Sequence, residues 1–287
     1  MDEQALDGSS RTRTYQAFGL SVQNWEYNAK SVTLAASKQP SIRLILSGRC
    51  REYGGSYNAE VHAPFTVIFY PANVNRTRQH FHLVDSQHLV MEFDRSLLAT
   101  KSMSKLVHPF AIYSPEALEL ISLLLMNLGT LYASQSKILS LSQQVLAMIA
   151  AEYSKSKTNP PQVLQLLKTI HKRFRERGLV HEQLIKELGY GVSHTSAMFS
   201  KYMGCPIGTY IRRLRLEYSR FLILNSTFNM GAIAGYAGFC NPSRLTSAFK
   251  REVGVAPTTY QQSIRGLTVP NTRLLMNVNR YQTRKAS

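Results

Sequence analysis

The sequence predicts an α+β protein in which a β-rich N-terminal half precedes an all-α C-terminal half. Before about residue 94, short apolar and β-branched runs alternate with turn residues. After that point, apolar residues recur at helical spacing, and one helical pattern occurs twice in the C-terminal half. We therefore expect a small β-barrel or sandwich, followed by helices.

The β-like runs are SIRLILSGR (41–49), TVIFY (66–70) and HLVMEF (88–93), separated by Gly54-Gly55 and Pro71-Ala72-Asn73. Residues 96–107, 115–134 and 137–155 have helical composition. The polar, proline-bearing stretch 154–162 predicts a linker, after which a new helix starts near Gln162. The expected organisation is a flexible tail (1–14), a β-rich domain with helices (15–157), a helical domain (158–264) and a basic tail (265–287).

The repeated pattern is FSKYMGCPIGTY (199–210) and FKREVGVAPTTY (249–260), in which Phe, Gly, Thr and Tyr recur 50 residues apart. Each copy ends a predicted pair of helices joined by a glycine-bearing turn, namely 181–188 with 192–203, and 230–236 with 242–253. Two helices joined in this way form a helix-turn-helix, whose second helix can enter a DNA major groove. A helical repeat built only for packing is the alternative.

Local signals support the predicted ends of these helices. Asn241 is an expected N-cap, with Pro242 at the first helical position. Gly204 and Gly254 are expected to terminate the second helices with positive φ. The absence of a side chain at Gly238 predicts that the second pair packs closely at its turn.

Short polar side chains and cations on the outer faces of the two second helices favour a DNA-binding role over packing alone. These residues are Ser193, His194, Ser196 and Ser200 in the first copy, and Ser243, Arg244, Ser247 and Lys250 in the second. Residues 207–224 predict a connecting helix of about 27 Å at 1.5 Å per residue. Such a helix can place two reading helices about 34 Å apart, one DNA turn. Its cations, Arg212, Arg213, Arg215 and Arg220, are candidates either for phosphate contacts or for solvated surface charges.

The charge is concentrated in the second half of the chain. The net charge of the 287 residues is +17. Residues 1–160 hold 15 basic and 12 acidic residues, and residues 161–287 hold 19 and 5, so the two parts carry +3 and +14. This asymmetry indicates that a polyanion such as double-stranded DNA meets the C-terminal half.

The stretch IAGYAGFCNPSRLTSAFKREVGVAPTTY (233–260) resembles the signature of the AraC/XylS family of bacterial transcription regulators. RRLRLEYSRFLI (212–223) is similar to the family's linker helix, and the resemblance covers about residues 162–262. More weakly, LSGRCREYGG (46–55) and VIFYPANVNRTRQ (67–79) resemble the family's cupin-like β-barrel with companion dimerisation helices. The resemblance implies a DNA-binding regulator, more often an activator that assists RNA polymerase, with an N-terminal domain that binds an effector or forms a homodimer.

The base-reading candidates combine the residues of the outer faces with the positions that the family's motif implies. They are Ser193, His194, Ser196, Ala197, Ser243, Arg244 and Ser247. The phosphate-contact candidates are Ser200, Lys201, Arg212, Arg213, Asn241, Lys250 and Arg251. Three positions depart from the family pattern, because Ala197 replaces a long polar residue, Ile185 a small residue and Ala232 an acidic residue. We therefore expect specificity to depend strongly on DNA shape and phosphate contacts.

The N-terminal half offers two further hypotheses. His80 and His82, with His88 and Glu92 beyond them, invite comparison with a metal cupin, but the required nearby carboxylate and glycines are missing, so strand-surface histidines are favoured. The arginines suit an anionic or nucleotide-type effector, although dispersed surface positions would also explain them. The effector candidates are Arg43, Arg49, Arg76 and Arg78.

Other features narrow the function classes. Three scattered cysteines, an acidic and polar N-terminus and an apolar run too short for a bilayer predict a cytoplasmic protein with no membrane partner. Neither a nucleophile–base constellation nor a P-loop is recognisable, so we expect neither an enzyme nor a cofactor or metal. Two rival interpretations stay open, a metal-dependent cupin enzyme with a nucleic-acid-binding appendage and a non-specific nucleic-acid-binding protein.

Overall fold

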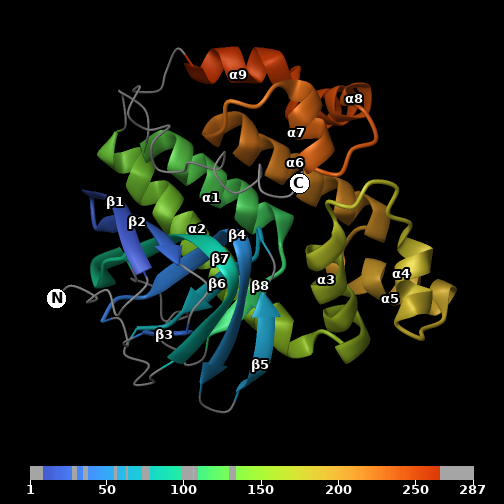
Figure 1. Ribbon diagram of the computed structural model, residues 1–287, viewed down its shortest axis with the longest axis horizontal. Helices are drawn as coiled ribbons and strands as arrows, with labels where there is room; N and C mark the ends of the chain where they lie inside the picture. The colour runs from blue at the N-terminus through green and yellow to red at the C-terminus, as the bar shows by residue number, and fades with distance from the viewer. Residues whose placement is uncertain are drawn as a thin grey trace. The chain divides into compact units, whose positions relative to one another are not determined.

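The structure is a computed structural model, and its secondary structure divides into a sheet unit and a helical unit (Figure 1). It describes residues 9–27, 31–34, 38–54, 57–62, 64–72, 78–97, 106, 109–128 and 134–265. The sheet unit contains the described residues up to Ile112, together with Ser134–Tyr153. The helical unit contains the described residues 113–128 and 154–265.

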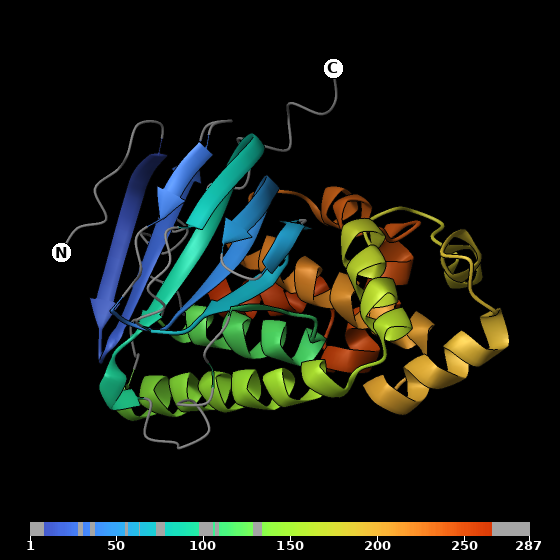
Figure 2. The same cartoon turned by 90° about the horizontal axis from the view of Figure 1, so that it is seen from below.

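The sheet unit is an antiparallel sheet of eight strands among the described residues (Figures 1 and 2). The strands are β1 (Ser9–Ala17), β2 (Leu20–Tyr27), β3 (Ser31–Leu34), β4 (Ser41–Gly54), β5 (Tyr57–His62), β6 (Val67–Tyr70), β7 (Arg78–Phe93) and β8 (Phe110–Ile112). Their order is β1-β2-β7-β4-β6-β8, with β3 paired to β7 and β5 paired to β4. The strand β1 begins inside the segment 1–14 that the sequence predicts to be a flexible tail.

The two long strands change partners along their length. The first part of β4 pairs with β6 and the last part with β5, and register shifts interrupt the β4–β7 ladder between residues 45 and 50. Bulges of this kind bend a strand and let it turn a corner between two packed layers. The predicted α+β class, with a strand-rich N-terminal half and a helical C-terminal half, is confirmed.

The first hairpin has a two-residue turn between β1 and β2. The β1–β2 turn consists of Phe18 and Gly19, with φ of 52° and 75°. Positive φ at both central residues is the pattern of a two-residue turn that matches the twist of the flanking strands. The turn also packs closely, because a Cβ on Gly19 would lie 3.1 Å from the Cβ of Asp94.

The two faces of the sheet differ in composition. One face is buried and entirely apolar in its central part, with Ile42 and Leu44 beside Met91 and Phe69. Residues 41 to 46 of β4 are all buried, so side chains on both faces of this part of the strand are covered. The other face carries Arg43, which lies 5.9 Å and 5.5 Å from the ring centroids of Tyr27 and Tyr70.

Two further elements complete the sheet unit. The 3₁₀ helix η1 (Arg95–Leu97) opens the segment predicted as helix 96–107, of which 98–105 and 107–108 lie outside the described residues. The helix α2 (Gln135–Thr158) contributes its residues up to Tyr153. Tyr153 packs on Phe110 of β8 at 5.1 Å between ring centroids, and Phe110 packs on Phe69 of β6 at 5.9 Å.

The helical unit contains α1 and the helices from α3 to α9. They are α1 (Pro115–Leu128), α3 (Pro161–Arg173), α4 (His181–Glu187), α5 (Val192–Met203), α6 (Ile207–Asn225), α7 (Met230–Tyr236), α8 (Pro242–Val253) and α9 (Pro257–Arg265). The predicted linker is shorter than expected, because α2 continues to Thr158 and only Asn159 and Pro160 separate it from α3. Lysine, serine and threonine tolerate a helix, whereas Pro161 favours the first turn of a new one.

Candidate nucleic-acid interface

The first helix-turn-helix consists of α4, a turn and α5. Leu184, Ile185 and Phe199 are fully buried and hold the two helices together. Gly189 ends α4 with φ of 76°, and its N–H donates to the carbonyl of Lys186 at 2.9 Å. The bounds of α5 agree with the predicted 192–203, and Gly204 terminates it with φ of 71°, as predicted.

The second helix-turn-helix consists of α7, a turn and α8. Asn241 caps α8 as predicted, because its Oδ1 accepts from the N–H of Arg244 at 2.9 Å. Asn229 caps α7 in the same way, accepting from Ala232 at 2.8 Å. Gly254 ends α8 with φ of 85°, which confirms the predicted terminator.

An aromatic pair explains the 50-residue repeat. In the first copy Phe199 packs edge-on against Tyr210, with 5.4 Å between ring centroids. In the second copy Phe249 packs against Tyr260 at 5.3 Å. Each pair ties a second helix to the helix that follows it, so the repeated residues build the same local core twice.

The base-reading candidates lie on the outside of α5 and α8. In α5, Ser193, His194 and Ala197 are exposed and Ser196 is half-buried. In α8, Ser243, Arg244 and Ser247 are exposed. The inward-facing Thr195 and Leu245 are buried, which fixes the rotation of each helix about its axis.

The phosphate candidates fall into two groups. Lys201, Asn241, Lys250 and Arg251 are exposed and Ser200 is half-buried, around α5 and α8. Arg251 also contacts the neighbouring Glu252 at 3.3 Å, and the side chain of Asn241 is already engaged as a cap.

The other group lies on α6 and has carboxylate partners. Arg212 lies 3.6 Å from Glu252 of α8. Arg213 donates to Glu116 of α1 at 2.9 Å, and both side chains of this pair are more than 40% exposed. An exposed ion pair contributes little to stability. The pair of Arg213 and Glu116 therefore holds α6 and α1 together only weakly, although the carboxylate neutralises the charge of the arginine.

The helix α6 holds the helical unit together through its apolar side. Its residues Leu214, Tyr218 and Phe221 are buried, and the helix contacts α5, α7, α8, α9 and α1. A more buried pair links α6 to α1, because Arg220 donates to Glu119 at 2.7 Å and to Glu217 at 3.1 Å.

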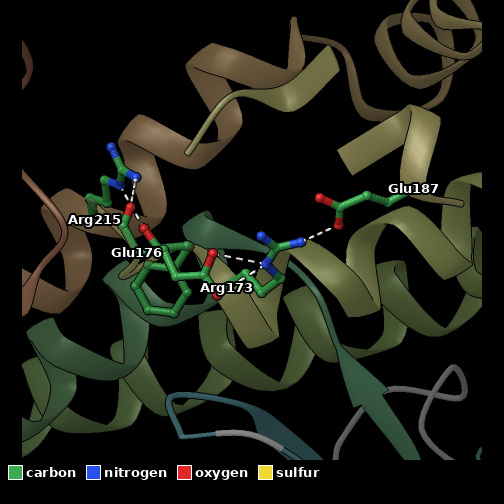
Figure 3. A network of polar contacts seen from close by, with 5 residues as sticks. Arg173, Glu176, Glu187 and Arg215 are labelled. Carbon is green, nitrogen blue, oxygen red and sulfur yellow. Dashed lines mark hydrogen bonds and ion pairs between the residues drawn. The ribbon is translucent and has the colours of Figure 1, made fainter. Parts of the chain in front are cut away.

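Arg215 of α6 and Arg173 of α3 make the polar contacts shown in Figure 3. The Arg215 guanidinium donates from Nε to the carbonyl of Phe174 at 2.6 Å and from Nη2 to the carbonyl of Glu176 at 2.8 Å. Arg173 pairs with Glu176 at 2.9 Å and with Glu187 of α4. From the sequence, Arg215 and Arg220 are candidates for phosphate contacts or for solvated surface charges, because the backbone carbonyls and distant carboxylates that they bind leave no local sequence signal.

Two buried titratable side chains, His171 and Glu217, lie in α3 and α6. Burial lowers the pKa of His171 to about 3, so the ring is neutral and contacts the Tyr210 hydroxyl at 2.9 Å. Burial also raises the pKa of Glu217 to about 8, against the opposing effect of Arg220. Both shifts favour the uncharged form of the side chain, as an apolar interior does.

The effector candidates lie in the sheet unit. Arg43 is buried on the aromatic-bearing face of the sheet. Arg49 and Arg78 are placed in β4 and β7, but their side chains, and Arg76 altogether, lie outside the described residues. The side chains of His80 and His82 lie outside them as well, and over the described part of the chain no cluster of three His, Cys, Asp or Glu could hold a metal ion. Within that same part, no helix is both long and apolar enough to cross a membrane.

Comparison with known proteins identifies a helix-turn-helix domain in the repeated part of the chain. Residues 184–263 match the family model of a helix-turn-helix domain. This match falls on the stretch, about residues 162–262, whose sequence resembles the AraC/XylS family. The chain is 24% identical over 103 residues to the probable transcription factor PqrA of Proteus vulgaris, a match that covers 36% of this chain and 82% of PqrA.

One further relative and one solved structure are also similar to this chain. The chain is 26% identical over 140 residues to the Msm operon regulatory protein of Streptococcus mutans, covering 49% of this chain and about half, 48%, of that protein. A solved structure of ToxT from Vibrio cholerae is 14% identical, with a TM-score of 0.37, covering 88% of this chain and 100% of that one.

Proposed function

We propose that the protein is a sequence-specific DNA-binding transcriptional regulator that places α5 and α8 in successive major grooves. The observation that carries the proposal is the duplicated helix-turn-helix, whose two second helices bury apolar residues on one side and present short polar groups and cations on the other. Helices of this kind dock in the major groove with their outward side chains on base edges. The curated relatives named above are transcriptional regulators, which supports the same function.

Selection from random DNA with the full-length protein tests this proposal. We expect enrichment of duplexes with two half-sites about one helical turn apart. Affinity for the enriched duplex should exceed affinity for bulk DNA by about 10³-fold or more at physiological salt. Binding without any enriched sequence would defeat the proposal and favour a non-specific nucleic-acid-binding protein.

The sheet unit is proposed to bind a small anionic effector on the face that carries Arg43. A guanidinium set among aromatic rings can bind an anionic group while the rings cover an apolar body. Such an effector would change DNA occupancy only if it favours one arrangement of the protein over another. Thermal unfolding with a panel of nucleotides and aromatic carboxylates tests this, and Arg43→Gln should abolish any stabilisation found; a ligand that stabilises both proteins equally would place the site elsewhere.

Activation through RNA polymerase and formation of a homodimer complete the proposal. In vitro transcription from a promoter carrying the selected site distinguishes activation from repression. Sedimentation of the free protein and of its DNA complex gives the stoichiometry. A single protein chain both in the free state and in the DNA complex would contradict the homodimer.

A further inference from the structure

A short turn after α3 is contacted from three sides within the helical unit. We refer to residues 173–177 as the 173–177 turn. On one side Arg215 of α6 binds two of its carbonyls, those of Phe174 and Glu176 (Figure 3). A guanidinium is a planar fork with fixed donor directions, so two bonds to one turn determine both its position and its orientation.

The second contact comes from α7 and the turn that follows it, at Gly235 and Gly238. A Cβ on Gly238 would lie 2.8 Å from the carbonyl oxygen of Phe174 and 2.9 Å from the Cα of Arg175. A Cβ on Gly235 would overlap the guanidinium of Arg177. Backbone of α7 and its turn therefore lies directly against the 173–177 turn.

The third contact comes from α4. Arg173 pairs with Glu187, in the last turn of α4, and also with Glu176 inside the turn. Arg175 adds a link to α6, because its guanidinium lies 5.6 Å from the ring centroid of Tyr218. The 173–177 turn thus contacts α4 of the first helix-turn-helix, α7 of the second, and the helix that joins them.

We propose that the 173–177 turn fixes the spacing and rotation between the two recognition helices, with Arg215 as the positioning residue. The inference rests on the proposed DNA-binding function. The two units are also connected through α6, which packs on α5, α7 and α8 and is joined to α5 and α7 by short segments that can act as hinges. By holding α4 and α7 against one turn, the contacts remove this freedom before DNA is bound, so the cost of ordering two separate units is not taken from the binding free energy.

The test compares Arg215→Met with Lys172→Met in the full-length protein. Lys172 is exposed at the end of α3. Its substitution removes one positive charge, as Arg215→Met does, and therefore serves as the matched control. The probes are the duplex selected by the wild type, each half-site alone, and the selected duplex with one base pair inserted between the half-sites. One added base pair rotates the second half-site by about 34–36°.

We expect Arg215→Met to bind the selected duplex about tenfold more weakly, because two hydrogen bonds from a charged group are lost. Affinity for single half-sites should stay within about twofold of the wild type, and the penalty for the inserted base pair should shrink. Lys172→Met should show neither of the last two changes. Equal losses on full and half-sites, or an unchanged insertion penalty, would overturn the inference while leaving the proposed function intact.

Amide hydrogen exchange of the DNA-free protein gives a readout that needs no binding site. Exchange in α4 and α7 should be faster in Arg215→Met than in Lys172→Met, because local opening becomes easier. Unchanged protection would contradict the role of the turn even if no DNA sequence is ever enriched. If Arg215→Met does not fold, Gly235→Ala applies the same test from α7. The added methyl displaces only the end of the flexible Arg177 side chain. If that variant keeps the full spacing preference and the full exchange protection, the inference is overturned.

Discussion

The two helix-turn-helix units share one plan but differ in how firmly each is built. In the second unit, Asn229 and Asn241 cap both helices with side-chain hydrogen bonds. In the first unit, Val180 and Gly191 stand at the equivalent positions without a side-chain cap. The turn glycines differ as well, because a Cβ on Gly238 would strike backbone whereas a Cβ on Gly189 would meet nothing within 4 Å.

The outer faces differ in charge in the same direction. The helix α8 presents Arg244, Lys250 and Arg251, whereas the cation of α5 is Lys201 and its reading positions are serines, a histidine and an alanine. Cations contact phosphates and guanine edges, and short neutral side chains mainly report shape and close approach. We infer that, in the proposed DNA complex, the second unit is the firm anchor and the first unit is the more adaptable one.

The largest expected effect comes from filling the turn of the second unit. Gly238→Val should lower the free energy of unfolding by about 3–5 kcal/mol, since overpacking and an unfavourable positive φ add together. Gly189→Val in the first unit suffers only the backbone penalty of about 1–2 kcal/mol. Urea unfolding of both variants checks this, and similar losses at the two glycines would remove the structural contrast between the units.

The next effect concerns base reading. Arg244→Ala should weaken binding to the selected duplex by about 1–3 kcal/mol and relax the sequence preference at one position. Ser196→Ala in the first unit should cost less than Arg244→Ala, because a neutral hydroxyl makes a weaker contact. Mobility-shift titrations against single-base variants of the site measure both. A uniform loss on every sequence would identify Arg244 as a phosphate contact instead.

The pH dependence of stability should separate the cores behind the two units. Because the folded pKa of His171, about 3, lies below its ordinary value of 6.5, the unfolded chain binds the proton more readily, and stability is lost as the pH falls below about 6.5. The folded pKa of Glu217 is raised from 4.5 to about 8, so its contribution is complete below 4.5 and is lost as the pH rises through 8. Unfolding midpoints between pH 4 and 9 check this, and Glu217→Gln should remove the loss expected between pH 4.5 and 8.

The smallest effects come from exchanging the caps. Asn241→Ala should destabilise the protein by about 1 kcal/mol, whereas Gly191→Asn, which gives α5 the missing cap, should stabilise it by a few tenths of a kcal/mol. The φ of −70° at Gly191 and the open space around it permit the new side chain. Thermal unfolding resolves both signs. A destabilised Gly191→Asn would mean that the first unit needs its glycine for another reason.

Local features of the helical half could be read from the sequence because their causes are local. The bounds of α5, α7 and α8, the Asn241 cap and the terminating glycines each depend on residues within one turn of the chain. The exposed reading positions follow from helical periodicity in the same way.

Long-range contacts could not be read in this way. Arg213 finds its carboxylate 97 residues away, and Arg215 finds its carbonyl 41 residues away. Periodicity predicts on which face of a helix a side chain lies, but not which other element packs against that face. Arginines that look like phosphate contacts in the sequence can therefore already bind groups of the protein itself. In the sheet unit, β4 extends beyond the predicted run 41–49 to Gly54, because the strand continues through bulges that leave no clear sequence signal.

The ion pairs of α1 have a practical consequence for isolating the DNA-binding part. The helix α1 begins soon after β8, yet its Glu116 and Glu119 pair with Arg213 and Arg220 of α6. A C-terminal fragment cloned from Pro161 onward would omit both carboxylates, which would leave Arg213 without Glu116 and Arg220 with Glu217 alone. Its solubility and its salt-dependent adhesion to any nucleic acid would then differ from those of the whole chain, so measurements of specificity on such a fragment would be biased towards non-selective binding.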